Sequence, residues 1–198
     1  MALPAPAPIL AGMSRDTFLS LCLANRFNVE ILRRLDVMPP GTWLTSGCLV
    51  QPVWNRNAGR AAEADIADYD LIYLDPDRSW EAEDRVIRRA ADLFADLPIR
   101  VQVRNQARVP IWYREKFGIP YPPVREAQHA VLRFPSKTTA IALTRGPTGK
   151  PVLYAPFGVG NALRGRIVPN HRLNIPSVYA EKAGRWTTIW PDLVVQPW

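Results

Sequence analysis

The sequence predicts an α/β fold in which helices pack on a single sheet. Segments of strand and helix character alternate between residues 42 and 104, and this alternation is typical of a sheet covered by helices. The chain has 198 residues, and 47% of them are hydrophobic, which is enough for one domain with a sizeable core.

The first two expected elements are short helices. Residues 14–27 carry apolar side chains at helical spacing after Ser14, which suits the N-cap of a helix. Residues 28–37 form a second helix, and the prolines that follow at 39 and 40 end it, because proline cannot continue a helix.

The next elements alternate between strand and helix. Residues 42–46 read as a short apolar strand, and residues 47–59 as a helix that contains Pro52. Residues 69–74 form a strand of β-branched and aromatic type. The clearest helix covers residues 79–97, with Ser79 as its cap.

The remaining elements follow the same patterns. Residues 99–104 alternate apolar and polar side chains, as a half-buried strand does. Two apolar runs flank a Gly- and Pro-containing turn and predict a hairpin, and three further segments have helical character. The hairpin covers 138–156, and the helices 126–134, 160–167 and 178–186.

Composition divides the chain into three parts: a flexible Pro/Ala-rich N-terminus (1–13), a core (14–117) and a Pro-rich C-terminal subdomain (118–198) that packs on the core. The first part lacks the basic start and long apolar centre of a secretion signal. No apolar run reaches the roughly 18 residues of a membrane span. We therefore expect a cytoplasmic protein without a membrane partner.

The chain is basic, with a formal net charge of +7 and a pI near 9.8. The excess is scattered, so it is consistent either with simple solubility or with a polyanionic ligand, from a nucleoside triphosphate to a nucleic acid. Cys22 and Cys48 lack the spacing of a zinc site or a disulfide framework and are expected to be buried thiols in a reducing compartment.

Two carboxylates stand where the third apolar run begins. Asp68 and Asp70 are two residues apart, and residues at this spacing in a strand point to the same side. Like charges held together repel unless one is protonated or a cation bridges them, and Mg²⁺ accepts such oxygen ligands. The pair is therefore either a metal site or a solvated polar turn.

A second feature precedes this pair by about twenty residues. Ser46 and Gly47 lie between the strand at 42–46 and the following helix. Small residues at a helix start allow a phosphate to approach the backbone N–H groups and the positive end of the helix dipole. The Ser46–Gly47 junction followed by an Asp-x-Asp strand favours a metal site at Asp68 and Asp70 over a solvated polar turn there.

The combination resembles the nucleotidyltransferase superfamily that includes DNA polymerase β, and more closely a family of small bacterial predicted nucleotidyltransferases. The resemblance runs from about residue 42 to the C-terminus. It rests on the segments "SGCLVQPVWN", "DYDLIYLD", "SWEAED", "VRNQARV", "WYREKFG", "YAPFG" and "WPDL".

The resemblance implies a polymerase β-like core with a mixed sheet, covering residues 14–117, and a Pro-rich C-terminal extension. It also implies Mg²⁺ or Mn²⁺ as cofactor and a nucleoside triphosphate as substrate. The acceptor is left open as a small molecule, a protein or an RNA, as is the oligomeric state. Metal ligands would be Asp68 and Asp70, and phosphate-binding residues Ser46, Gly47, Arg104, Asn105 and Arg108.

The sequence departs from the family where a third carboxylate is expected, because Gln102 occupies that position. Glutamine can ligate a metal or orient a water, but it cannot act as a general base. We therefore predict that Gln102 belongs to the catalytic site. A catalytically silent nucleotide- or RNA-binding domain remains the alternative function. Asp65 or Glu63 could restore the enzyme if either reached the metals.

Other candidates carry less weight. Arg104 and Arg108 suit phosphate oxygens, but they also fit a solvated surface. Asp75 and Asp77 suit a turn before a helix. The two histidines have no partner at ligand spacing, and most tryptophans are expected in the core, with stacking on a nucleobase open to one of them. The histidines are His129 and His171, and the tryptophans weighed are Trp54, Trp80, Trp112, Trp186, Trp190 and Trp198.

Overall fold

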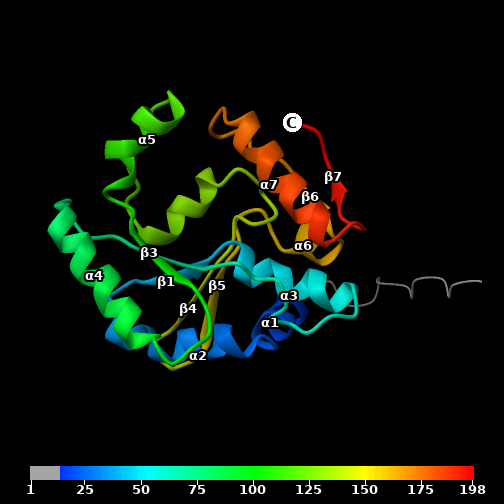
Figure 1. Cartoon of the computed structure of the whole chain (residues 1–198), viewed down its shortest axis with the longest axis horizontal. Helices are drawn as coiled ribbons and strands as arrows, with labels where there is room; N and C mark the ends of the chain where they lie inside the picture. The colour runs from blue at the N-terminus through cyan, green and yellow to red at the C-terminus, as the bar shows by residue number, and fades with distance from the viewer. Residues whose placement is uncertain (1–13) are drawn as a thin grey trace, which may run out of the picture.

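A mixed five-stranded sheet forms the centre of the molecule (Figure 1). The computed structural model describes residues 14–198, so the predicted flexible N-terminus lies outside the described residues. The strand order is β3-β2-β1-β4-β5, with only β2 and β3 parallel to each other. The strands are β1 (Trp43–Thr45), β2 (Tyr69–Tyr73), β3 (Val101–Asn105), β4 (Ala142–Arg145) and β5 (Pro151–Tyr154).

Four amino-terminal helices cover one face of this sheet. Leu44, Leu71 and Val103 point to this face and join one large buried cluster with side chains from the helices. Figure 1 shows α1 and α2 below the sheet. The helices are α1 (Arg15–Leu23), α2 (Arg26–Arg34), α3 (Gly47–Asn57) and α4 (Trp80–Leu93), with a short 3₁₀ turn, η1 (Leu35–Val37), after α2.

The opposite face carries the side chains of Asp70 and Ile72 and is covered by later segments. Ile72 packs with Ala130 and Val131 in a second, smaller cluster. Figure 1 shows α5 and α7 on the upper side of the sheet, opposite α1 and α2. These segments are α5 (Val109–Phe117), η2 (Ala127–Arg133) and α7 (Pro176–Ile189), and α6 (Gly160–Leu163) with the strand pair β6 (Arg166–Ile167) and β7 (Val194–Val195) completes the chain.

Most predicted elements are confirmed. Ser14 and Ser79 cap α1 and α4 by accepting hydrogen bonds from the amides of Thr17 and Ala82. Pro52 lies inside α3. The helix expected at 126–134 is a 3₁₀ helix, and the sequence analysis assigned no element to α5.

The expected Pro-rich C-terminal extension is not what the structure contains. The division at residue 117 remains a prediction, but the central sheet crosses it, because β4 pairs with β1 and β5 pairs with β4. Strand pairing between distant segments cannot be predicted from local composition. The proline content after residue 117 therefore indicates an extension, although two strands of the central sheet lie there.

No helix among residues 14–198 is both long and apolar enough to cross a membrane.

Candidate functional site

The two aspartates and Gln102 come together at one edge of the β2–β3 pair. Asp70 is the register partner of Gln102 on β3 and of Thr45 on β1, so these three residues form a row across the sheet. The Nε2 of Gln102 donates a hydrogen bond of 3.0 Å to Oδ2 of Asp68. The side chains predicted to share a face therefore do so, with the amide of Gln102 against one carboxylate.

The segment that leads into Asp68 is fixed by Asn55 of α3. The side-chain amide of Asn55 donates to the carbonyls of Ala62 and Ala64, and its Oδ1 accepts from the indole N–H of Trp190 at 2.9 Å. Asn55 is fully buried. The loop before the aspartate pair is thus tied both to α3 and to the end of α7.

Asp70 lies in an electrostatically unfavourable position for a carboxylate. Burial raises its pKa to about 6, and the neighbouring charge of Asp68 adds to this effect, while Lys182, Arg104 and Arg100 act in the opposite direction. Two half-buried carboxylates near one another create a local excess of negative charge. A bound cation would offset that excess.

Ser46 and Gly47 form the turn between β1 and α3. Ser46 has φ 71° and ψ −134°, a conformation that glycine adopts easily and serine rarely does. Its amide donates to the carbonyl of Ile141 at 3.1 Å, which holds the turn against the segment before β4. A methyl group added at Gly47 would lie 2.8 Å from Nε2 of Gln51, so glycine leaves room for that side chain.

The strain at Ser46 leads to a paired prediction. Ser46→Gly relieves the backbone strain and is expected to stabilise the protein by about 1 kcal/mol, whereas Ser46→Ala keeps the strain and gains nothing. Both variants lack the hydroxyl, so both are expected to bind nucleotide more weakly. Urea unfolding and nucleotide titration of the two variants check this. Wild-type nucleotide affinity in Ser46→Gly would show that the hydroxyl is dispensable.

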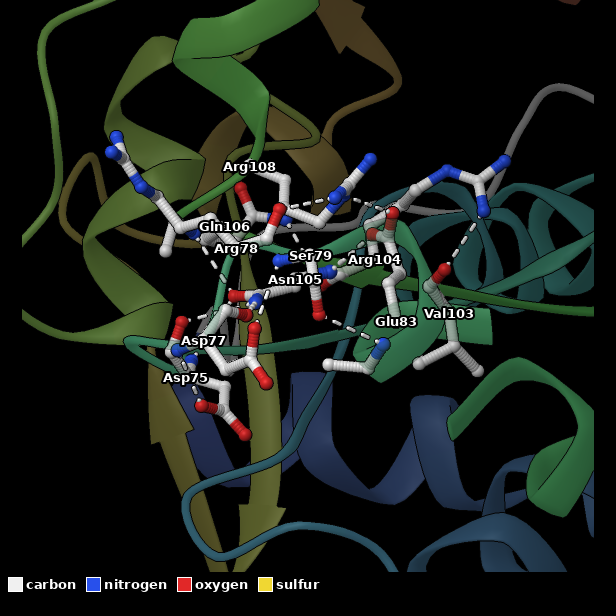
Figure 2. A network of polar contacts seen from close by, with 12 residues as sticks. Asp75, Asp77, Arg78, Ser79, Glu83, Val103, Arg104, Asn105, Gln106 and Arg108 are labelled. Atoms are coloured by element: carbon white, nitrogen blue, oxygen red, sulfur yellow. Dashed lines mark hydrogen bonds and ion pairs between the residues drawn. The ribbon is translucent and has the colours of Figure 1, made fainter. Parts of the chain in front are cut away.

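Asn105 and Arg108, predicted to contact phosphate, take part in an internal network (Figure 2). Asn105 is 1% exposed, and its side chain bonds to the backbone of Asp75, Asp77 and Ala107. Nε of Arg108 lies 2.8 Å from Oε2 of Glu83 in a largely buried ion pair. Both side chains therefore hold β3 to the start of α4, and their assignment to phosphate remains a prediction.

Neither alternative carboxylate completes a set of three. Asp65 forms an ion pair with Arg60, and Glu63 lies 3.4 Å from Arg26. Across residues 14–198 no group of three or more histidine, cysteine or acidic side chains is arranged to hold a metal ion. Among the described residues, Asp68 and Asp70 thus remain the candidate carboxylate ligands, as predicted from the sequence.

A cavity of about 260 Å³ opens beside Asp70 on the second face of the sheet. This is far more than the roughly 10–15 Å³ that one water molecule requires. Thr45, Ser46 and Asp70 line it on the sheet side. The basic side chains of Arg104, Arg133 and Lys182 and a group of aromatic side chains from α5 complete its walls.

Sequence reasoning missed several residues of this cavity. Lys182 belongs to α7 and Arg133 to the end of η2, and both are far in the sequence from Asp68 and Asp70. Of the elements that line the cavity, α5 has local sequence signals for its boundaries: a proline at its start and Gly118, in the left-handed conformation, at its end. Proline at the first turn and glycine after the last are typical helix boundaries.

The remaining sequence candidates lie outside this cavity. Asp75 and Asp77 form the predicted turn before α4, where their side chains accept from the amides of Asp77 and Ser79. His129 packs near Tyr154, and His171 near Trp198. Both cysteines are buried thiols, as expected, and burial raises the pKa of the Cys48 thiol.

Comparison with known proteins places the chain in a family. A family model described as "Nucleotidyltransferase" matches residues 31–195, so the chain belongs to that nucleotidyltransferase family. A structure determined by NMR and described as revealing a CCA-adding enzyme head domain is similar in fold, with a TM-score of 0.76. The two chains are 20% identical, and the match covers 96% of this chain and 100% of the other. Comparison with curated proteins finds no match.

The structural likeness at this identity shows a shared fold. The polymerase β-like core expected from the sequence is confirmed at that level, with its mixed sheet and packed helices. Family membership indicates an enzyme that uses a nucleoside triphosphate.

Proposed function

We propose that the protein is a metal-dependent nucleotidyltransferase, which transfers a nucleoside monophosphate from a nucleoside triphosphate to a hydroxyl acceptor. One observation supports this most: Asp70 pairs with Thr45 next to the Ser46–Gly47 turn, and Ser46 and Asp70 line one cavity with basic side chains. A bound triphosphate is held by a metal ion, by the backbone N–H groups at a helix start and by basic side chains.

The donor set fits Mg²⁺ or Mn²⁺. These ions take oxygen ligands, need only one or two carboxylates, and keep other positions for water and substrate phosphates. The pKa of Asp70 is raised first by burial and then by the charge of Asp68, and a divalent cation between the two carboxylates would offset both effects. When bound, the ion would neutralise phosphate charge and stabilise the charge that develops during transfer.

The chain's own residues would bind and orient the substrate. Asp68 and Asp70 would hold the metal, and the amides at the start of α3, with the Ser46 hydroxyl, would seat the β- and γ-phosphates. Lys182 of α7 and Arg104 of β3 would supply further positive charge to the cavity. In the reaction the acceptor hydroxyl would lose its proton to water, its oxygen would form a bond to the α-phosphorus, the bond from that phosphorus to the oxygen bridging to the β-phosphate would break, and pyrophosphate would leave.

Gln102 favours a second candidate, a domain that binds nucleotide without turnover. Its amide cannot remove the proton of an attacking hydroxyl, and neither Asp65 nor Glu63 stands in for the missing acid. Such a domain would keep the metal and phosphate ligands but lack the general base, whose contribution is typically about 10²- to 10⁴-fold in rate.

Label transfer separates the two candidates. The protein is incubated with Mn²⁺, a cell extract as acceptor pool, and nucleoside triphosphates labelled at the α-phosphate. A transferase is expected to release pyrophosphate and label an acceptor, and Asp70→Asn is expected to do neither. If the wild type binds nucleotide but transfers no label, while Gln102→Glu does, the silent domain is the correct function. Absence of binding would contradict both.

A further inference from the structure

One wall of the cavity is aromatic and is formed by α5 and the segment after it. Tyr113 of α5 lies at its centre, with ring centroids 4.5 Å from Phe117, 4.7 Å from Tyr121 and 5.8 Å from Trp112. All four side chains line the same cavity as Ser46 and Asp70. The cavity therefore has Ser46 and Asp70 on its sheet side and aromatic side chains on its α5 side, where the Arg133 guanidinium lies 5.1 Å from the Tyr121 ring centroid.

Trp112 differs from the tryptophans of the core. Trp54, Trp186 and Trp190 are at most 3% exposed. The rings of Trp186 and Trp190 both pack edge-to-face against the ring of Trp54. Trp112 is half-buried and borders the cavity, and the ammonium of Lys116 lies 5.9 Å from its ring centroid. Within residues 14–198 it is the tryptophan that lines this cavity.

The cavity is also lined by the amide side chain of Gln106. Gln106 follows β3 and is 5% exposed. Its amide nitrogen makes a long contact of 3.4 Å with the carbonyl of Arg104. An amide carries both donors and an acceptor, so it can pair with the edge of a heterocyclic ring as well as with the backbone.

We propose that the aromatic wall of the cavity binds the nucleobase of the triphosphate, with Trp112 stacking on the base and Gln106 contacting its edge. The proposal rests on the proposed function, which puts the phosphates on the Ser46–Asp70 side. A nucleoside triphosphate has charge at one end and a flat ring at the other, and the cavity offers it Ser46 and Asp70 on the sheet side and aromatic side chains on the α5 side. Stacking accepts every base and favours the larger ring area of purines, so purine nucleotides bind more tightly.

The test compares each nucleoside triphosphate with inorganic tripolyphosphate, both with Mn²⁺, by titration calorimetry. Wild type is expected to bind ATP and GTP more tightly than CTP and UTP, and all four more tightly than tripolyphosphate. Trp112→Ala is expected to lose about 5- to 150-fold in affinity for the purine nucleotides, which is the range of one base–aromatic stack. Its affinity for tripolyphosphate is expected to stay unchanged, and Trp112→Phe to lie between the two.

Ile111→Ala is the matched control, because Ile111 is the preceding residue of α5 and is 54% exposed. It should leave all affinities unchanged. Equal binding of ATP and tripolyphosphate by the wild type would overturn the base site while leaving the phosphate site intact. Equal weakening of both ligands in Trp112→Ala would also overturn it, since that pattern reports damage to the fold. Failure of the wild type to bind either ligand would overturn the proposed function itself.

Discussion

Asp70→Asn is expected to stabilise the metal-free protein near neutral pH and to abolish metal-dependent nucleotide binding. In the folded protein the pKa of Asp70 is raised to about 6 by burial and by Asp68. The folded state thus holds the proton more tightly than the unfolded chain does. The free energy of unfolding falls as the pH rises from about 4 to about 6 and is level above that, for this group alone.

Asparagine carries no charge at any pH, so this variant should not show that loss. We expect Asp70→Asn to exceed the wild type by about 1–3 kcal/mol in free energy of unfolding near neutral pH and by much less near pH 4. Urea unfolding without metal at both pH values measures it. Asp92→Asn, which removes an exposed carboxylate of α4, is the control. A variant less stable than wild type at neutral pH would contradict the unfavourable charge assigned to Asp70.

Glu83→Ala is expected to destabilise the protein by about 3–5 kcal/mol, because it leaves the charge of Arg108 largely buried and unpaired. Glu83 is 5% exposed, and its two oxygens accept from the backbone amide of Asn105 and face the Arg108 guanidinium, each at 2.8 Å. The substitution removes both contacts and loosens the join between α4 and β3. That join supports the strand that bears Gln102.

The control is Glu81→Ala, which removes an exposed carboxylate from the same first turn of α4. It is expected to change the free energy of unfolding by less than about 0.5 kcal/mol. Chemical denaturation of both variants gives the comparison. A loss below about 1 kcal/mol for Glu83→Ala would put this pair among weak surface ion pairs and contradict its structural role.

The sequence was sufficient for those parts of the site that depend on local periodicity. The two-residue spacing of Asp68 and Asp70 put them on one side of a strand, and the alternation in residues 99–104 put Gln102 on the matching side. The strand register confirms that Asp70 and Gln102 lie next to each other on β2 and β3. The Ser46–Gly47 turn was equally local, because a strand-to-helix junction involves only neighbouring residues.

Contacts between distant segments were beyond local reasoning. Lys182 and Arg133 reach the cavity only because the chain returns over the second face of the sheet after β3. Glu83 was indistinguishable in the sequence from the other acids at the start of α4, which favour the positive end of a helix. Its burial against Arg108 depends on how α4 packs on β3, which local sequence does not reveal.

The thermal unfolding midpoint with Mn²⁺ and each of the four nucleoside triphosphates, for wild type and Asp70→Asn, tests most directly whether the aspartate pair holds a metal-bound nucleotide. A ligand at about 100 times its Kd stabilises the folded state by roughly 2.7 kcal/mol, which gives a readily measured shift. We expect the wild-type midpoint to rise only when metal and nucleotide are both present, and the Asp70→Asn midpoint to stay at its metal-free value. No rise in folded wild type with any of the four, or an equal rise in Asp70→Asn, would contradict the assignment of this site.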